Sequence, residues 1–329
     1  MKTKDIQVFI RKLNQDTVLI NKKSRYLHKT KAILFSLFKF VILLGISYII
    51  LGPVISIISH SFFSSTDIYN PTAYLIPLNP TLENYSLSFI RLNYFKTLGY
   101  TMLFVSSITF IQVFITSMAG YGFARFDFPF KKLLFAFVII TIVLPTHTIM
   151  LPLYAHFRNF DVFGIFNGIL GHKLNLLSKE TPIVMMSLLG CGLRSGLFIY
   201  IFRQFFRGLP KEIEEAAFID GAGMAYTYLR IMLVNAVPAI ITVTVFSMVW
   251  QYNDMFYNTL FSVPAGHSIS LQLSTIQATL TFVDQIRDPN VVQLYTYAGV
   301  ILVILPILVV YLILQKYFIE GVERSGIVG

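Results

Sequence analysis

Six long apolar blocks, separated by polar segments, constrain this chain more than any other feature of its sequence. A hydrocarbon core about 30 Å thick is crossed by roughly 20 helical residues, and each block is long enough to do so. Backbone N–H and C=O groups find no partner in lipid, so a helix, which pairs them internally, is the expected structure of each block. The predicted spans are residues 33–59, 98–121, 133–154, 183–206, 235–258 and 297–317.

The composition does not fit a soluble domain. Charged residues make up 13% of the chain and hydrophobic residues 55%, whereas soluble domains carry about 25% charged residues. The chain therefore lacks the charge that a water-exposed surface would need. Transmembrane barrels are built from alternating strands of about ten residues, and the long apolar blocks do not have that pattern. We expect an all-α integral membrane protein with six transmembrane helices, resident in the lipid bilayer.

The net charge of +10 is concentrated at the N-terminus and in short loops between apolar blocks. Residues 1–31 contain nine lysines and arginines against two aspartates. Basic segments of this kind stay on the cytoplasmic side of a membrane. We therefore place the N-terminus, the loops 122–132 and 207–234 and, after an even number of spans, the C-terminus in the cytoplasm. The interleaved basic and aromatic residues of a nucleic-acid-binding module are lacking, so we expect no nucleic-acid partner.

The chain is predicted to have two parts, a basic cytoplasmic extension at residues 1–31 and one six-helix membrane domain at residues 32–329. The first apolar block begins after Lys31 and is longer than the roughly 7–15 residues of a signal-peptide core, so no cleaved signal peptide is expected. The single cysteine, Cys191, excludes an internal disulfide framework.

Motifs for nucleotide and metal chemistry are absent from the sequence. It contains neither a G-x-x-x-x-G-K-[ST] phosphate-binding loop nor an H-E-x-x-H zinc motif. We therefore expect no catalytic residue, cofactor or metal in this chain. An intramembrane enzyme or a channel would need convergent catalytic residues or rings of polar side chains along a pore, and the sequence shows neither.

The loop between the fourth and fifth predicted spans carries the most specific signal. Residues 209–223 read LPKEIEEAAFIDGAG. Pro210 suits the first turn of a helix, and Gly221 can adopt the left-handed conformation that ends one. The acidic side chains that follow the proline favour the positive end of the helix dipole, and the small residues permit close approach by another protein. These residues are Glu212, Glu214 and Glu215, then Ala216 and Ala217, with Asp220 before the glycine. We expect a short cytoplasmic helix; the alternative is an ordinary solvated connector.

The order of residues in this loop resembles the EAA loop of ABC importer permeases. The similarity lies in Glu215-Ala216-Ala217, then Asp220-Gly221, then Ile231 and Leu233. The family pattern continues with a proline directly after the leucine, whereas this chain has Val234 there and its nearest proline at Pro238. Residues 121–129 (YGFARFDFP), 202–206 (FRQFF), 250–254 (WQYND) and 317–329 are similar to segments of the smaller, six-span subunit of carbohydrate permeases.

This resemblance implies a fold, a function and a set of partners. The fold would be a type I, maltose-permease-like bundle in the bacterial inner membrane, with residues 210–221 as a coupling helix seated on an ATPase subunit. The function would be the permease subunit of an ATP-driven carbohydrate importer; a permease for a peptide or an amino acid is the alternative. The implied partners are a second homologous permease, two ATP-binding subunits that hold ATP and magnesium, and an extracellular or periplasmic sugar-binding protein.

Polar side chains at membrane depth are costly and are therefore candidates for function. The fifth predicted span offers a set whose spacing places its members on one face of a helix. The set is Trp250, Asn253, Asp254, Tyr257 and Asn258. Aromatic and hydrogen-bonding side chains together suit a sugar, so we predict that this stripe lines the transport pathway. Interhelical hydrogen bonding with an aromatic anchor at the interface is the alternative.

Two further polar residues lie inside predicted spans. Arg194 is expected near the bilayer centre, where it needs a carboxylate or a cavity. Pairing with an acid of the partner permease is favoured over contact with an acidic sugar. His147 follows Pro145 in the third span, and a packing role is favoured over a substrate contact.

Overall fold

The computed structural model describes the backbone of residues 3–326 and the side chains of Lys31 and residues 33–316. The elements are α1 (Thr3–His60), η1 (Asp67–Tyr69), α2 (Glu83–Arg91), α3 (Tyr94–Arg125), α4 (Lys131–Val143), η2 (Thr146–Ile149), α5 (Met150–Arg158), α6 (Ile165–Leu170), α7 (Thr181–Leu188), α8 (Ser195–Gly208), α9 (Glu212–Ile219), α10 (Met224–Tyr226), η3 (Thr227–Met232), α11 (Leu233–Asn235), α12 (Val237–Tyr252), α13 (Phe256–Leu260), η4 (Ala265–His267), α14 (Ile269–Ser274), α15 (Ile276–Phe282) and α16 (Pro289–Gly326). The described backbone contains no strand, and an isolated bridge pairs Phe160 with Leu174. The predicted all-helical fold is confirmed.

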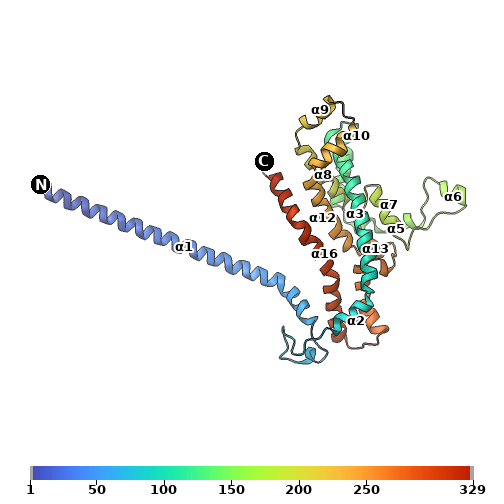
Figure 1. Ribbon diagram of the computed structural model, residues 1–329, viewed down its shortest axis with the longest axis horizontal. Helices are drawn as coiled ribbons and strands as arrows, with labels where there is room; N and C mark the ends of the chain where they lie inside the picture. Colours follow the sequence, from blue (N-terminus) through green and yellow to red (C-terminus); the bar gives the residue numbers. More distant parts are fainter. Residues whose placement is uncertain (1–2, 327–329) are drawn as a thin grey trace. The chain divides into compact units, whose positions relative to one another are not determined.

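The chain divides into two compact units, Met1–His60 and Ser61–Gly329. The first unit is α1, which continues without a break through Lys31, the boundary that we predicted for the basic extension. Apart from Lys31, the side chains of that extension lie outside the described residues, and its role stays a prediction. The second unit holds all the helices that follow α1 (Figure 1).

Three helical segments are long and apolar enough to cross a membrane, namely Ile33–His60, Tyr94–Arg125 and Pro289–Lys316. Two pairs of helices also qualify if each pair is a single bent span. Lys131–Val143 and Thr146–Arg158 meet at 104°, and Met224–Asn235 and Val237–Tyr252 meet at 77°. These segments account for five of the six predicted windows, and the described part of the chain is a helical membrane bundle.

The prediction of one continuous helix per window was wrong for three of the windows. Leu144 is extended because the following Pro145 disfavours the helical conformation, so the third window turns there. The fourth window is two helices, α7 and α8, because Gly190 and Arg194 have positive φ angles of 71° and 59°. In the fifth window α12 ends at Tyr252 and a separate helix, α13, follows.

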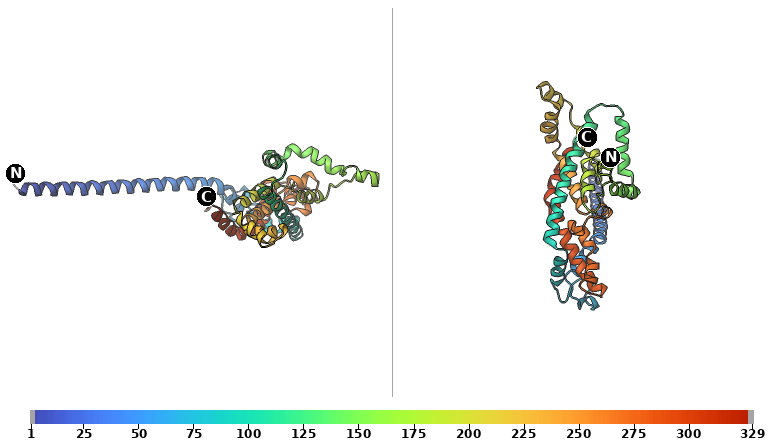
Figure 2. Two further views of the ribbon diagram at one scale, coloured as in Figure 1. Left: turned by 90° about the horizontal axis from the view of Figure 1, so that it is seen from above. Right: turned by 90° about the vertical axis from the view of Figure 1, so that its right-hand side faces the viewer.

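The long helix α3 is central to the second unit, packing against α7, α8 and α12, while α12 also packs against α16 (Figure 1). The right-hand view of Figure 2 shows α3 and α16 running along a common direction, with the segment around α9 projecting beyond their ends. A glycine allows α3 and α8 to approach closely. A β-carbon added at Gly120 would lie 2.5 Å from Phe202 Cβ and 2.9 Å from the Arg203 nitrogen. Small residues have this use in membrane bundles, where lipid is as apolar as the helices and close packing drives association.

A buried glutamine joins three helical segments through polar contacts. Gln112 of α3 is fully buried. Its Nε2 donates to the Leu193 carbonyl (2.9 Å), between α7 and α8. Its Oε1 accepts from Ser247 Oγ (2.7 Å) and Gln251 Nε2 (3.2 Å) of α12. We call Gln112, Leu193, Ser247 and Gln251 the glutamine hub.

Replacing Gly120 with alanine should destabilise the protein, because the added methyl group overlaps backbone and Cβ atoms of α8 that cannot swing away. Overpacking of this kind costs about 1–3 kcal/mol. The thermal unfolding midpoint of the purified protein in detergent should fall. Gly122→Ala is the matched control, since its nearest neighbour is Phe126 Cδ2 at 4.0 Å. Equal midpoints for the two variants would show that the α3–α8 contact is not tight.

Candidate coupling site and transport pathway

The loop after α8 contains the short helix that the sequence predicts. Helix α9 begins at Glu212, two residues after Pro210, and ends at Ile219. The chain then reverses at Gly221, whose φ of 82° is a conformation that glycine adopts without a steric penalty. The glycine acts as expected, whereas the proline lies just before the helix and not in its first turn.

One of the three glutamates faces the protein interior. Glu214 is buried, and its Oε1 accepts a hydrogen bond from the Tyr121 hydroxyl at 2.6 Å. Its Oε2 lies 2.9 Å from Nε of Arg125, also in the last turns of α3. Arg125 Nη2 in turn donates to the Leu209 carbonyl at 2.8 Å, just before α9. We call Tyr121, Arg125 and Glu214 the α3–α9 anchor.

The α3–α9 anchor fixes the loop to the end of the longest helix in the second unit. Its side chains are nearly excluded from solvent, with 7% of Arg125 and 9% of Glu214 exposed. Removing one partner of a buried ion pair costs about 3–5 kcal/mol, because the other charge is left without compensation. Helix α9 is therefore held on the end of α3 by a buried ion pair and a hydrogen bond.

The opposite side of α9 is exposed. It carries the remaining acidic residues together with small and apolar ones: Glu212, Glu215, Ala216, Phe218, Ile219, Asp220 and Gly221. Ile219 is 85% exposed, although a large aliphatic side chain normally finds cover. The prediction that Ala216 and Ala217 both face outward was wrong for Ala217, which is only 5% exposed and packs inward. Ala216 and Gly221 are the small residues that remain on the exposed side of this region.

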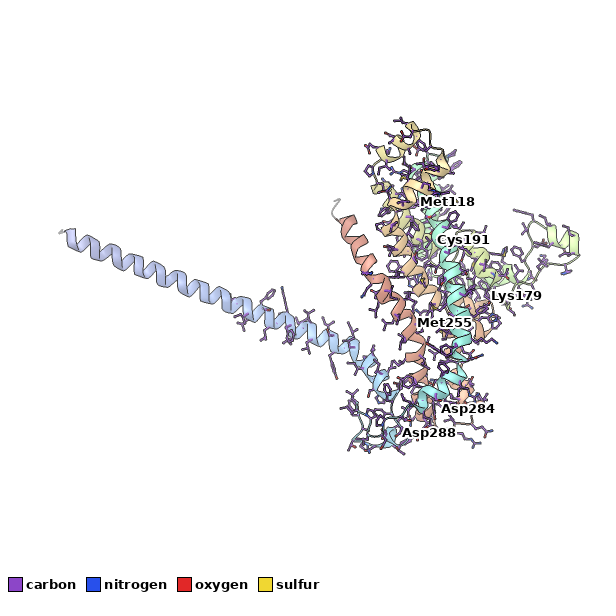
Figure 3. All side chains as sticks on the ribbon, viewed as in Figure 1. Met118, Lys179, Cys191, Met255, Asp284 and Asp288 are labelled. Atoms are coloured by element: carbon purple, nitrogen blue, oxygen red, sulfur yellow. The ribbon has the colours of Figure 1, made fainter. Side chains whose placement is uncertain are left out.

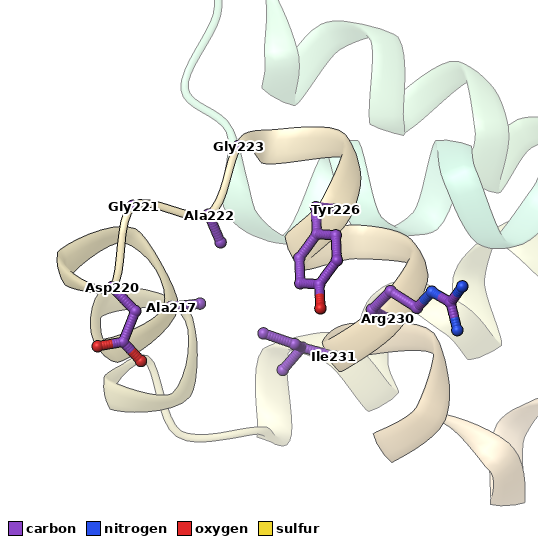
Figure 4. Close-up of a pocket in the computed structure, with 8 residues that line it drawn as sticks. All are labelled: Ala217, Asp220, Gly221, Ala222, Gly223, Tyr226, Arg230 and Ile231. Carbon is purple, nitrogen blue, oxygen red and sulfur yellow. The ribbon is translucent and has the colours of Figure 1, made fainter.

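A cleft of about 630 Å³ lies between α9 and the π-helical turn η3. Its lining residues are Ala217, Asp220, Gly221, Ala222, Gly223, Tyr226, Arg230 and Ile231 (Figure 4). The side chains of Ala217, Tyr226 and Ile231 surround the space, and Asp220 and Arg230 lie on opposite sides of it (Figure 4). An apolar floor between an acid and a base suits an inserted side chain of another protein.

The stripe predicted for the fifth span does not lie on one helix. Helix α12 ends at Tyr252, so Trp250 lies on it while Tyr257 and Asn258 belong to α13. Asp254 occupies the break, and its Oδ1 accepts from the backbone nitrogens of Phe256 (3.1 Å) and Tyr257 (3.2 Å). Asp254 thereby pairs two backbone N–H groups in the first turn of α13, which have no partner within the helix.

The members of the stripe differ in exposure. Asp254, Tyr257 and Asn258 are buried, and Asn258 Nδ2 donates to the Asp254 carbonyl. Asn253 is exposed and donates to Val249 at 2.9 Å. Trp250 is half-buried, stacked on Phe246 and Phe198. Tyr257 and Asn258 thus form part of the core, while Trp250 and Asn253 remain accessible.

Arg194 and His147 each contact an aromatic ring. The Arg194 guanidinium lies 5.5 Å from the centre of the Trp250 ring, so the structure brings together two residues that the sequence analysis treated separately. His147 is exposed and meets Phe256 edge-on at 4.8 Å. The choice between a packing role and a substrate contact for this histidine stays a prediction.

Sequence reasoning did not identify the glutamine hub or the contacts of the α3–α9 anchor. Gln112 is a polar residue inside an apolar block, and the rule applied to the fifth span would have selected it. Tyr121 and Arg125 entered the prediction only as part of residues 121–129, a segment similar to one in carbohydrate permeases. Their partner Glu214 is 89 residues beyond Arg125, a separation that no local pattern bridges.

Known proteins with similar sequences are transport permeases. A probable ABC transporter permease protein of Pyrococcus horikoshii is 28% identical, with 84% of this chain and 92% of the relative covered. The arabinooligosaccharides transport system permease protein AraQ of Halalkalibacterium halodurans is 26% identical, with 86% and 93% covered. The diacetylchitobiose uptake system permease protein NgcG of Streptomyces coelicolor is 24% identical, with 85% and 84% covered.

A solved structure shows the same fold. A chain of a bacterial ABC transporter involved in the import of the acidic polysaccharide alginate superposes with a TM-score of 0.68 at 20% identity, covering 87% of this chain and 96% of that one. The family model that describes the binding-protein-dependent transport system inner membrane component matches residues 112–324, more than half of the sequence. The chain therefore belongs to the family of binding-protein-dependent transport system inner membrane components.

Proposed function

We propose that this chain is the transmembrane permease subunit of a bacterial ABC importer that moves a carbohydrate into the cytoplasm. The observation that carries the proposal is the α9 region, in which an exposed acidic and apolar face is held on α3 by the buried α3–α9 anchor. Relatives named for arabinooligosaccharide and diacetylchitobiose transport support a carbohydrate over a peptide or an amino acid.

A permease of this family works with a substrate-binding protein and with ATPase subunits. We propose that two ATPase subunits bind ATP and magnesium. A second homologous permease completes the pathway. This chain has no phosphate-binding loop of its own. Its contribution is to bind the ATPase at α9 and to change shape in response.

The proposed coupling runs along α3. ATP-driven closure of the ATPases displaces α9, and the α3–α9 anchor passes that displacement to the end of α3. Further along α3 the glutamine hub connects to the break between α7 and α8 and to α12. Those two segments carry Arg194 and Trp250, so work done at α9 reaches the proposed pathway through two polar links on one rigid helix.

The same geometry supports the proposed placement of the α9 region on the cytoplasmic side. At 1.5 Å per residue, the 32 residues of α3 extend about 48 Å, more than a hydrocarbon core. The α9 region lies at one end of the second unit, while Asp284 and Asp288 lie at the other end (Figure 3). An Arg91–Asp284 ion pair and a hydrogen bond from Tyr69 to Asp288 tie the segments at that outer end.

Reversing the charge of Glu215 should abolish transport without removing the protein from the membrane. Glu215 is exposed, so Glu215→Lys leaves the core intact while opposing the proposed ATPase contact. Substrate-stimulated ATP hydrolysis by the reconstituted complex should fall about tenfold or more, the factor that a loss of about 1.4 kcal/mol of docking free energy produces. Gly221→Asp should act alike, because its φ of 82° is strained for other residues.

Glu83→Lys is the matched control for this charge reversal. Glu83 is an exposed glutamate in the first turn of α2, at the outer end of the bundle. The Glu83 variant should retain stimulated hydrolysis. If the Glu215 variant assembled and hydrolysed ATP normally, α9 would not be the mechanical link.

Breaking the α3–α9 anchor should uncouple hydrolysis from transport. Glu214→Gln or Arg125→Met alone leaves a buried charge unpaired, so each should lower the free energy of unfolding by about 3–5 kcal/mol. The double variant removes both charges and should lose less stability than the two single losses added together. Thermal unfolding in detergent, with sugar uptake into vesicles, measures both effects. Strictly additive losses would show that Glu214 and Arg125 do not interact.

A further inference from the structure

Arg194 has an unusual backbone for a residue inside a membrane protein. Its φ of 59° is a left-handed conformation that few residues other than glycine adopt, and it directly precedes α8. The neighbouring Leu193 carbonyl is held by Gln112 of the glutamine hub. The position is therefore fixed by the surrounding structure, and strain of this kind persists at sites that use it.

Arg194 follows Cys191 by three residues, in the break between α7 and α8. Cys191 lies between the levels of Met118 and Met255 along the long direction of the bundle, away from the outer end marked by Asp284 and Asp288 (Figure 3). A cation at such a depth is costly unless it faces water or a binding partner.

The charge of Arg194 is not neutralised by the described side chains. The ion pairs among them are Arg91–Asp284, Arg125–Glu214, Lys131–Asp127 and His267–Glu180, and Arg194 takes part in none. The guanidinium is exposed and contacts the face of Trp250. Its hydrogen-bond donors are therefore free to meet a ligand.

Trp250 supplies a flat surface beside that cation. Its ring stacks with Phe198, at 5.8 Å, and with Phe246, at 5.3 Å, both nearly parallel to it. Because the ring is fixed by stacking but only half-buried, its exposed part is presented at little cost in conformational entropy. Such a surface suits the C–H face of a sugar ring.

An unpartnered buried oxygen lies in the same region. Asp254 is 6% exposed, and its Oδ2 has no hydrogen-bond partner in the described part of the structure. Asp254 follows Trp250 by four residues in the chain, in the break between α12 and α13. A buried carboxylate oxygen without a donor costs free energy, which a ligand hydroxyl would recover.

We propose that Arg194, Trp250 and Asp254 form a binding site for a carboxylate-bearing sugar, so that the importer carries acidic oligosaccharides. The guanidinium binds the carboxylate, the tryptophan ring packs on the sugar face, and Asp254 accepts a hydroxyl. The inference rests on the proposed function and adds the charge of the substrate to it. Two roles are predicted for Arg194, pairing with an acid of the partner permease and contact with an acidic sugar. The inference favours the sugar contact, because the ring beside Arg194 belongs to the predicted pathway.

The chemistry of arginine explains why an acid is expected. The planar guanidinium matches a carboxylate with two parallel hydrogen bonds. A hydrogen bond to a charged group contributes about 1.5–3 kcal/mol. Removal of the guanidinium should therefore lower the affinity for an acidic ligand roughly tenfold to a hundredfold. A neutral sugar of the same shape should lose little.

The site can be tested with the single tryptophan of this chain. The complete transporter is reconstituted in nanodiscs and titrated with digalacturonate or with its neutral counterpart, galactobiose. The signal of Trp250 is the fluorescence difference between the wild-type complex and the Trp250→Phe complex. We expect saturable quenching by digalacturonate at a concentration at least about tenfold lower than by galactobiose.

Two substitutions at Arg194 distinguish the effect of its charge from the effect of its backbone conformation. Arg194→Asn keeps a residue that tolerates the left-handed conformation and should raise the half-saturating concentration of digalacturonate about tenfold or more, leaving that of galactobiose unchanged. Arg194→Lys should recover part of the affinity. An unchanged elution volume of the complex would show that both variants assemble.

Other outcomes would overturn the inference. Equal affinity for the two disaccharides, no quenching by either, or an Arg194→Asn variant that binds digalacturonate normally would assign Arg194 to contacts with another subunit. The proposed function fails separately, if neither acidic nor neutral saccharides presented with the binding protein stimulate ATP hydrolysis by the wild-type complex.

Discussion

Every polar group at membrane depth must find its partner inside the protein, and the glutamine hub shows how this chain meets that constraint. Gln112 is fully buried on α3, yet its amide is satisfied by Leu193 and by the α12 side chains Ser247 and Gln251. Lipid tails compete with apolar packing but not with these hydrogen bonds. The hub therefore fixes the relative register of α3, α12 and the break before α8, while Gly120 fixes how closely α3 approaches α8.

The α3–α9 anchor extends the same principle to the end of the bundle. Gln112 and Tyr121 lie nine residues apart on one helix, about 14 Å along its axis. Because an uninterrupted helix is stiff over that length, the α3–α9 anchor and the glutamine hub cannot shift independently. A short helix bound only by apolar contacts could slide over α3; one bound by a buried ion pair at Glu214 moves with it. This pairing of links gives the proposed transmission a physical route that needs no long-range rearrangement of the core.

The sequence was informative where one local cause determines the structure. Apolar length located the windows of the spans, and Pro210 and Gly221 bounded α9 because each acts through its own backbone. The breaks were missed because their causes are not local. Arginine seldom adopts a positive φ, so the conformation at Arg194 depends on the hub that holds Leu193. The inward direction of Glu214 and the burial of Asp254 likewise depend on partners elsewhere in the chain or on a helix end that periodicity alone does not reveal. A residue spacing of three and four indicates one face only while the helix continues.

The same breaks that defeated the periodic prediction explain the placement of the proposed substrate site. Non-helical backbone at membrane depth is tolerated only where it is buried in protein or lines a cavity. Two of the three interrupted windows break before α8 and after α12, and these breaks carry Arg194 and Asp254, with Trp250 in the last turn before the second. In a continuous helix the backbone nitrogens of Phe256 and Tyr257 would be paired within the helix, and Asp254 could not accept from them as it does here. The Arg194 cation lies beside the Trp250 ring, and the glutamine hub binds both interrupted segments to α3. Substrate recognition and coupling would then depend on the same few buried polar contacts.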